Sequence, residues 1–162
     1  MKTTVIVNPC AGNGRTAKIW PNIESALKQS IGSFQTEETS CQGDAILLTR
    51  QALDAGATRI VAIGGDGHLN EVLNGFIEND VQLNPQASLS FVMSGIGCDF
   101  QRSLGMSGKW QAAVVKLKDA QIRQIDVGKV SYTAPDKTRK IRYFDNIASF
   151  GLGGAVDHYI DN

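Results

Sequence analysis

The sequence is poor in the features that mark several common protein classes. Its three cysteines, Cys10, Cys41 and Cys98, are odd in number and form no close pair, so they do not indicate a disulfide framework. Its 16 basic and 16 acidic side chains cancel, so no overall field attracts nucleic acid or an anionic membrane. No apolar run approaches the ~20 residues of a membrane span, and the N-terminus lacks a signal-peptide core. These absences predict a cytoplasmic protein with reduced thiols and no nucleic-acid partner.

Short apolar segments alternate with amphipathic ones along the chain. Thr3–Val7 is β-branched and apolar without alternation, which is typical of a strand buried on both faces. Thr16–Leu27 then shows helical spacing, with Pro21 tolerable only in a first turn. Because strand and helix alternate three times with short loops, the sequence predicts a three-layer α/β domain with an open, mainly parallel sheet. The 162 residues suffice for one full domain.

The remaining elements follow from the same periodicities. The expected strands and helices after the first pair are Ser33–Glu38, Ala45–Leu53, Arg59–Ile63, Leu69–Phe76, Leu89–Met93, Trp110–Leu117 and Gln121–Val127. From Lys129 the pattern alternates about a turn at residues 134–137, which predicts an antiparallel hairpin, and a glycine-rich stretch follows at residues 147–154. We therefore divide the chain into an α/β nucleotide-binding domain, residues 1–128, and the start of an incomplete β-rich second domain, residues 129–162.

The most informative stretch runs from Ile60 to Phe76. A buried strand ends at Gly64-Gly65-Asp66-Gly67, and a helical pattern follows at once. Backbone N–H groups and the positive end of the helix dipole meet in such a turn, which suits a phosphate. Glycines there allow close approach of a ligand and dihedral angles closed to other residues. Asp66 would repel a phosphate unless a cation such as Mg²⁺ lies between them. The plainer alternative is a tight turn whose aspartate caps the helix.

Four turns of this kind follow predicted parallel strands. They occupy residues 8–14, 39–44, 64–67 and 94–99. Because parallel strands share one carboxyl edge, where ligands of such sheets bind, these turns should gather around one ligand. The sequence therefore predicts a phosphate-containing ligand at that edge.

The same segments resemble the diacylglycerol kinase catalytic domain family, which includes bacterial lipid kinases and sphingosine kinases and looks related to the NAD kinases. The resemblance rests on residues 8–12, on 64–67 with Asn70 and Glu71, on 95–100 with Arg102, and on 125–128, which occur in the family's order and spacing. It covers nearly the whole chain.

The resemblance implies an ATP site at the strand ends. It places these residues around the nucleotide: Asn8, Pro9, Cys10, Ala11, Gly12, Thr39, Gly65, Asp66, Gly67, His68, Leu69, Asn70, Glu71 and Ile96. Asp66, Asp99 and Asp126 match family acids that organise water and Mg²⁺. The family usually has Thr in place of His68 and Ile96, and Asn in place of Cys98. His68 could donate to phosphate in place of a hydroxyl and would add charge if protonated, whereas Ile96 cannot bond a phosphate.

The implied activity is transfer of the ATP γ-phosphate to a lipid hydroxyl, as in diacylglycerol. Such transfer needs mainly positioning and charge neutralisation. In the family, a second β-sandwich domain supplies the general base, so no catalytic base is expected in this chain and the chain alone is expected to be inactive. The implied partners are a nucleotide, a lipid acceptor reached through that domain, a membrane surface contacted peripherally, and a second copy of the chain in a homodimer.

Two other functions remain open from the residues. Residues 12–17, GNGRTA, fit the G-x-G-x-x-A pattern of an NAD(P)-binding oxidoreductase, with Glu37 about 20 residues on. Alternatively, Cys10, Cys41, Cys98 and His68 all fall in strand-end loops and could form a metal or redox site of a non-catalytic regulatory protein.

Overall fold

The computed structural model describes residues 1–106 and 109–149. The expected glycine-rich stretch is described only as far as Ser149, and the rest of that expectation lies outside the described residues.

Four parallel strands form the central sheet. They are β1 (Thr3–Val7), β2 (Gln35–Glu38), β3 (Arg59–Gly64) and β6 (Ser88–Met93), in the order β2-β1-β3-β6. The register pairs Val5 with both Thr36 and Val61, and Val61 with Ser90. All strands therefore end at one edge, as the sequence predicts.

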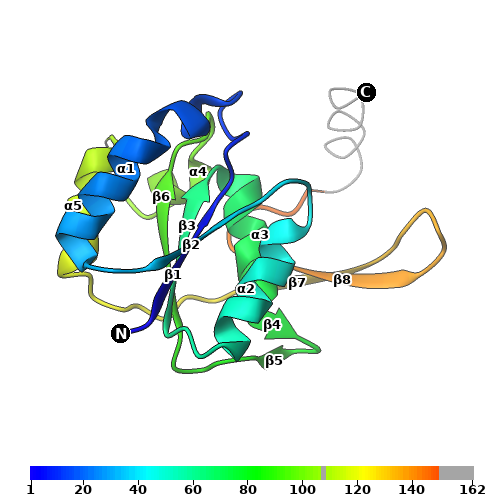
Figure 1. The fold of residues 1–162 in the computed structure, drawn as a ribbon. Helices are drawn as coiled ribbons and strands as arrows, with labels where there is room; N and C mark the ends of the chain where they lie inside the picture. The colour runs from blue at the N-terminus through cyan, green and yellow to red at the C-terminus, as the bar shows by residue number, and fades with distance from the viewer. Residues whose placement is uncertain (107–108, 150–162) are drawn as a thin grey trace.

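Helices cover both faces of this sheet, so the predicted three-layer α/β fold is confirmed (Figure 1). Helices α1 (Arg15–Ile31) and α5 (Trp110–Lys118) lie on one face, and α2 (Asp44–Asp54) and α3 (Asp66–Phe76) lie on the other. Successive residues of a strand point to opposite faces. Accordingly, Val5 and Val7 pack in one core with Ile23 of α1, whereas Ile6 packs in the other core.

Two sequence expectations about regular structure are wrong. Residues 121–127 form no strand, because their main chain joins no ladder within the described part of the chain, and residues 121–126 are exposed. Pro21 lies in the second turn of α1 rather than the first. It is exposed there, and its ring removes the N–H that would bond the carbonyl of Ala17.

Beyond the sheet, the predicted hairpin is confirmed as β7 (Gly128–Thr133) and β8 (Arg139–Phe144), which pair antiparallel. A short helix, α4 (Asp99–Ser103), and a two-stranded pair, β4 (Ile77–Glu78) with β5 (Val81–Gln82), complete the regular elements of the described residues. No helix within the described ranges is both long enough and apolar enough to cross a membrane.

The hairpin is fastened to α3 by two asparagines. Asn74 accepts from the Tyr143 N–H at 2.9 Å and donates to the Tyr143 carbonyl at 2.9 Å. The Asn74 side chain therefore makes both backbone hydrogen bonds that a neighbouring strand would make to Tyr143. Asn70 donates to the same carbonyl at 2.9 Å. At the other end of α3, the Tyr143 hydroxyl donates to Asp80, which also accepts from Lys129 at 2.6 Å. The residues that follow β8 are thereby placed beside the carboxyl edge of the sheet.

Candidate functional site

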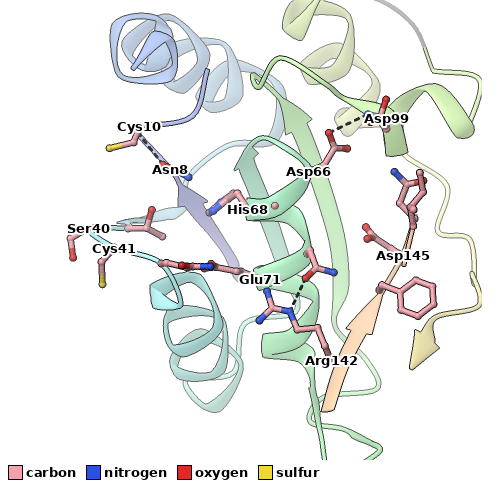
Figure 2. A pocket seen from close by; sticks show the side chains of 17 residues that line it. Asn8, Cys10, Ser40, Cys41, Asp66, His68, Glu71, Asp99, Arg142 and Asp145 are labelled. Atoms are coloured by element: carbon pink, nitrogen blue, oxygen red, sulfur yellow. Dashed lines mark hydrogen bonds between the residues drawn. The ribbon is translucent and has the colours of Figure 1, made fainter. Parts of the chain in front are cut away.

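A cavity of about 620 Å³ lies at the carboxyl edge of the sheet (Figure 2). This volume is in the range of small-molecule sites. The cavity is lined by Asn8, Cys10, Thr39, Ser40, Cys41, Gln42, Asp66, Gly67, His68, Asn70, Glu71, Asp99, Arg142, Phe144, Asp145, Asn146 and Ile147. The turns after β1, β2 and β3 therefore meet around one space, and the loop after β6 adds Asp99.

The predicted site residues divide into two groups. Those that line the cavity are Asn8, Cys10, Thr39, Asp66, Gly67, His68, Asn70, Glu71 and Asp99. Those that do not are Pro9, Ala11, Gly12, Gly65, Leu69, Ile96 and Asp126. Leu69 is 1% exposed in the core under α3, and Ile96 is 81% exposed. Asp126 lies in the exposed segment after α5 and does not line the cavity as Asp66 and Asp99 do.

Two glycines of the turns let neighbouring loops pack on one another. A Cβ on Gly95 would lie 2.6 Å from the Gly65 Cα, and a Cβ on Gly12 would lie 2.8 Å from the Ser94 carbonyl. The expected unusual dihedral angles are absent from Gly64, Gly65 and Gly67, since none of these three has a positive φ. At Gly64 the chain needs glycine for close contact, because a Cβ there would lie 2.7 Å from the His68 ring.

The first turn of α3 is open to the cavity. Its N-cap residue is Gly65, and no side chain caps the helix. Asp66 instead accepts from the backbone N–H groups of Asp99 at 3.2 Å and Phe100 at 3.1 Å, so it ties α3 to the start of α4. The alternative in which Asp66 caps its own helix is therefore wrong. A Cβ on Gly67 would meet nothing within 4 Å, which leaves room for a ligand at the amides of this turn.

His68 does not serve as a charged donor. Its Nε2 lies 3.0 Å from the carbonyl of Ile6, to which it donates, and the side chain is buried. Burial lowers the pKa of His68 below its ordinary value of 6.5. The ring is therefore neutral at pH 7, and the donor expected for a phosphate is used inside the fold.

Two other loops are held by carboxylates. Glu71 accepts from the backbone N–H of Gly43 at 3.0 Å and so links α3 to the start of α2. Asp44 accepts from the hydroxyl of Ser40 at 2.7 Å and from the N–H of Cys41 at 2.9 Å. Hydrogen bonds from Ser40 and Cys41 lower the pKa of Asp44, and the same carboxylate raises the pKa of the Cys41 thiol. The wall that contains Thr39 is thus rigidly attached to the neighbouring helices.

The cysteines do not form the metal or redox cluster that the sequence left open. Cys10 and Cys41 line the cavity, but Cys98 does not, and its thiol donates to the Gly95 carbonyl. Within the described ranges, no three side chains of His, Cys, Asp or Glu are arranged to hold a metal ion.

The far wall of the cavity was missed by sequence reasoning. It consists of Arg142 and of residues 144–147, which follow the end of β8. Asp145 is half-buried there, and burial together with the nearby charge of Asp66 raises its pKa. The available signal was a polar pair, Asp145 and Asn146, directly after a predicted strand. The other turns were identified by glycine or threonine after a predicted strand, and residues 144–147 contain neither.

Comparison with known proteins assigns the family. Residues 2–130 match the diacylglycerol kinase catalytic domain, and this segment contains all four predicted turns. The chain belongs to the diacylglycerol kinase catalytic domain family. Its members include a diacylglycerol kinase of Staphylococcus haemolyticus, 31% identical over 91% of this chain and 41% of that protein, and one of Bacillus subtilis, 30% identical over 93% of this chain and 46% of that protein. The chain thus spans less than half the length of these relatives.

A solved structure of a family member supports the same fold. The crystal structure of a diacylglycerol kinase from Bacillus anthracis superposes with a TM-score of 0.67 at 25% identity, over 80% of this chain and 43% of that one. The family assignment disfavours the oxidoreductase alternative. Consistent with this, Gly12 of the G-x-G-x-x-A pattern packs against Ser94 and does not line the cavity.

Proposed function

We propose that this chain is the nucleotide-binding part of a lipid kinase and that ATP binds in the cavity at the sheet's carboxyl edge. The observation that carries the proposal is the uncapped first turn of α3, which opens into the cavity beside Gly67. Free amides and the helix dipole favour a phosphate at this place. The loops containing Asn8 and Thr39 would surround the rest of the nucleotide.

Mg²⁺ is the cation that we propose to accompany the phosphates. Asp66 and Asp145 both line the cavity, and the charge of Asp66 helps to raise the pKa of Asp145. A cation between phosphate and carboxylates would relieve this repulsion, and Mg²⁺ typically uses one or two carboxylates with water and phosphate oxygens. When bound, it would neutralise charge on the phosphates. Asp99 also lines the cavity but is paired with Arg102.

The transfer step requires more than the described residues. We propose that the full protein transfers the γ-phosphate to a hydroxyl of a diacylglycerol-like lipid, with the general base and the acceptor site contributed by a second domain that begins near residue 129. The hairpin β7–β8 would then belong to that domain while its end forms one wall of the nucleotide cavity. This chain alone is accordingly expected to bind ATP without phosphorylating lipid.

Thermal unfolding with added ligand tests the binding proposal. ATP with Mg²⁺ at about 100 times its dissociation constant should stabilise the fold by about 2.7 kcal/mol, which raises Tm by roughly 5–10 °C for a domain of this size. NADH should give no comparable rise. Gly67→Leu, which fills the open space at α3, should abolish the rise, whereas Ala17→Leu in the exposed first turn of α1 should keep it. Absence of any rise with wild-type protein at millimolar ATP would refute the proposal.

A further inference from the structure

The cavity has an unbalanced set of charges. Asp66, Glu71, Asp99 and Asp145 contribute four carboxylates to its lining. Among the described lining residues, Arg142 alone carries a permanent positive charge. An anionic ligand that enters this cavity therefore meets one guanidinium among several carboxylates.

This guanidinium is held in place by Asn70. The Arg142 Nε donates to the Asn70 Oδ1 at 2.9 Å, the dashed contact beside Arg142 in Figure 2. Asn70 is itself fixed, because its Nδ2 donates to the Tyr143 carbonyl at 2.9 Å and its Oδ1 accepts from Asn74 at 3.3 Å. An Asn side chain offers two donors and two acceptor positions, so these contacts use both acceptor positions of Asn70 and one of its two donors.

The outer edge of Arg142 is available. Within the described parts of the chain, none of the four lining carboxylates forms an ion pair with Arg142, although Asp99 pairs with Arg102. The two terminal nitrogens of a guanidinium present a planar fork that matches the oxygens of a phosphate. Asn70 lies one helical turn from Asp66, about 6 Å along α3. A fork held at Asn70 is therefore within reach of a phosphate chain that begins at the first turn of the helix.

We propose that Arg142 binds a phosphate group of the nucleotide and that Asn70 is a positioning residue that presents it. The assignment rests on the proposed ATP site and makes that site more specific. It places the nucleotide between two parts of the chain that are far apart in sequence, the first turn of α3 and the end of β8. Asn70 acts on the nucleotide through the guanidinium rather than by touching it.

A double-mutant cycle in the 162-residue chain tests this assignment. ATP affinity is measured with Mg²⁺ for the wild type, Arg142→Gln, Asn70→Ala and the double variant. Arg142→Gln should weaken ATP binding at least about tenfold, as expected when a hydrogen bond to a charged group is lost. Asn70→Ala should weaken it similarly, and in the Arg142→Gln background it should add little, because the two residues act as one unit. Arg139→Gln, on the exposed side of the same strand, is the matched control and should bind like the wild type.

Further readouts separate a phosphate contact from a structural effect. The dependence of ATP affinity on salt should be shallower in Arg142→Gln than in the wild type, since one charged contact is gone. Arg142→Lys, which keeps the charge, should recover part of the affinity. Adenosine should bind Arg142→Gln and the wild type equally.

The outcomes distinguish the two proposals. Equal ATP affinity in Arg142→Gln and the wild type would overturn the assignment of Arg142 and leave the ATP site standing. Equal losses for ATP and adenosine would show that Arg142 contacts the base or sugar and would overturn the phosphate assignment. Fully additive effects would overturn the positioning role of Asn70. A wild-type chain that binds no ATP would refute the proposed function itself.

Discussion

Alanine at Gly75 should destabilise the protein although it is a better helix former than glycine. Gly75 is buried in α3 where this helix crosses α2. A Cβ there would lie 2.4 Å from the Thr49 Cβ and 2.8 Å from the carbonyl oxygen of Ile46. The second contact is with backbone, so a change of rotamer cannot remove it and α2 must move. The Thr49 side chain is fixed as well, because its hydroxyl donates to the Ala45 carbonyl.

The expected magnitude is the difference between two effects. Overpacking of this kind costs about 1–3 kcal/mol, whereas replacing glycine by alanine inside a helix gains about 0.5–1 kcal/mol. Because the contacts at Gly75 are shorter than 3.0 Å and one is with backbone, the overpacking cost lies in the upper part of its range, about 2–3 kcal/mol. The Gly75→Ala variant should therefore unfold with a free energy lower by about 1–2.5 kcal/mol. For a domain of this size, that corresponds to a Tm lower by roughly 2–10 °C.

Gly67 in the same helix provides the matched substitution. A Cβ there would meet nothing within 4 Å, and its φ is not positive. Gly67→Ala should leave the unfolding free energy unchanged or raise it by up to about 1 kcal/mol. Urea unfolding followed by circular dichroism measures both variants, with the slope m as a check that the same surface is exposed. A Gly75→Ala variant as stable as the wild type would refute the close approach of α2 and α3 on which the reasoning depends.

Two further predictions concern titration and thiol reactivity. Burial lowers the folded-state pKa of His68 below 6.5, so the unfolded chain binds the proton more readily than the folded chain does. The unfolding free energy should therefore fall as pH drops through 6.5, and this dependence should be absent above that pH. His68→Gln should show a smaller loss of unfolding free energy between pH 7 and pH 5. The Asp44 carboxylate raises the pKa of the Cys41 thiol, so Cys41 should react with a thiol reagent more slowly than the exposed Cys10. Asp44→Asn should selectively accelerate the reaction of Cys41. Mass spectrometry of the labelled peptides measures both rates.

The sheet and its helices could be predicted because their residues obey simple periodicities. Val5, Ile6 and Val7 are apolar in succession, and in the structure they are buried on both faces of the sheet. The strand expected at residues 121–127 rested on weaker evidence. A strand requires a partner as well as a suitable pattern, and the sequence does not state whether a partner is present. The prediction that Asp126 lies at a strand end depended on that strand, and in the structure Asp126 lies in an exposed segment that does not line the cavity.

The far wall of the cavity could not be predicted because it depends on buried polar side chains. Asn70 and Asn74 follow one another at i and i+4, a spacing that places two polar residues on one helical face. Such a face is normally expected to meet solvent. In the structure it meets the main chain of Tyr143, and Asn74 is 6% exposed. Recognising this contact would require knowing that the hairpin packs against α3, and no local sequence pattern indicates that tertiary contact.

The glycine-rich turns show how the meeting of loops at one sheet edge can be inferred for a partly incorrect reason. Sequence reasoning gave the glycines at 64–67 unusual dihedral angles, whereas the structure shows ordinary angles and close contacts between loops. The two explanations differ in what they imply for mutation. If dihedral freedom were the requirement, any side chain at Gly65 would strain its own turn. Because contact is the requirement, a side chain at Gly95 would push away the Gly65 backbone, 2.6 Å from its Cβ, and shift the first turn of α3. The proposed phosphate site at α3 should therefore be sensitive to a residue that does not line the cavity.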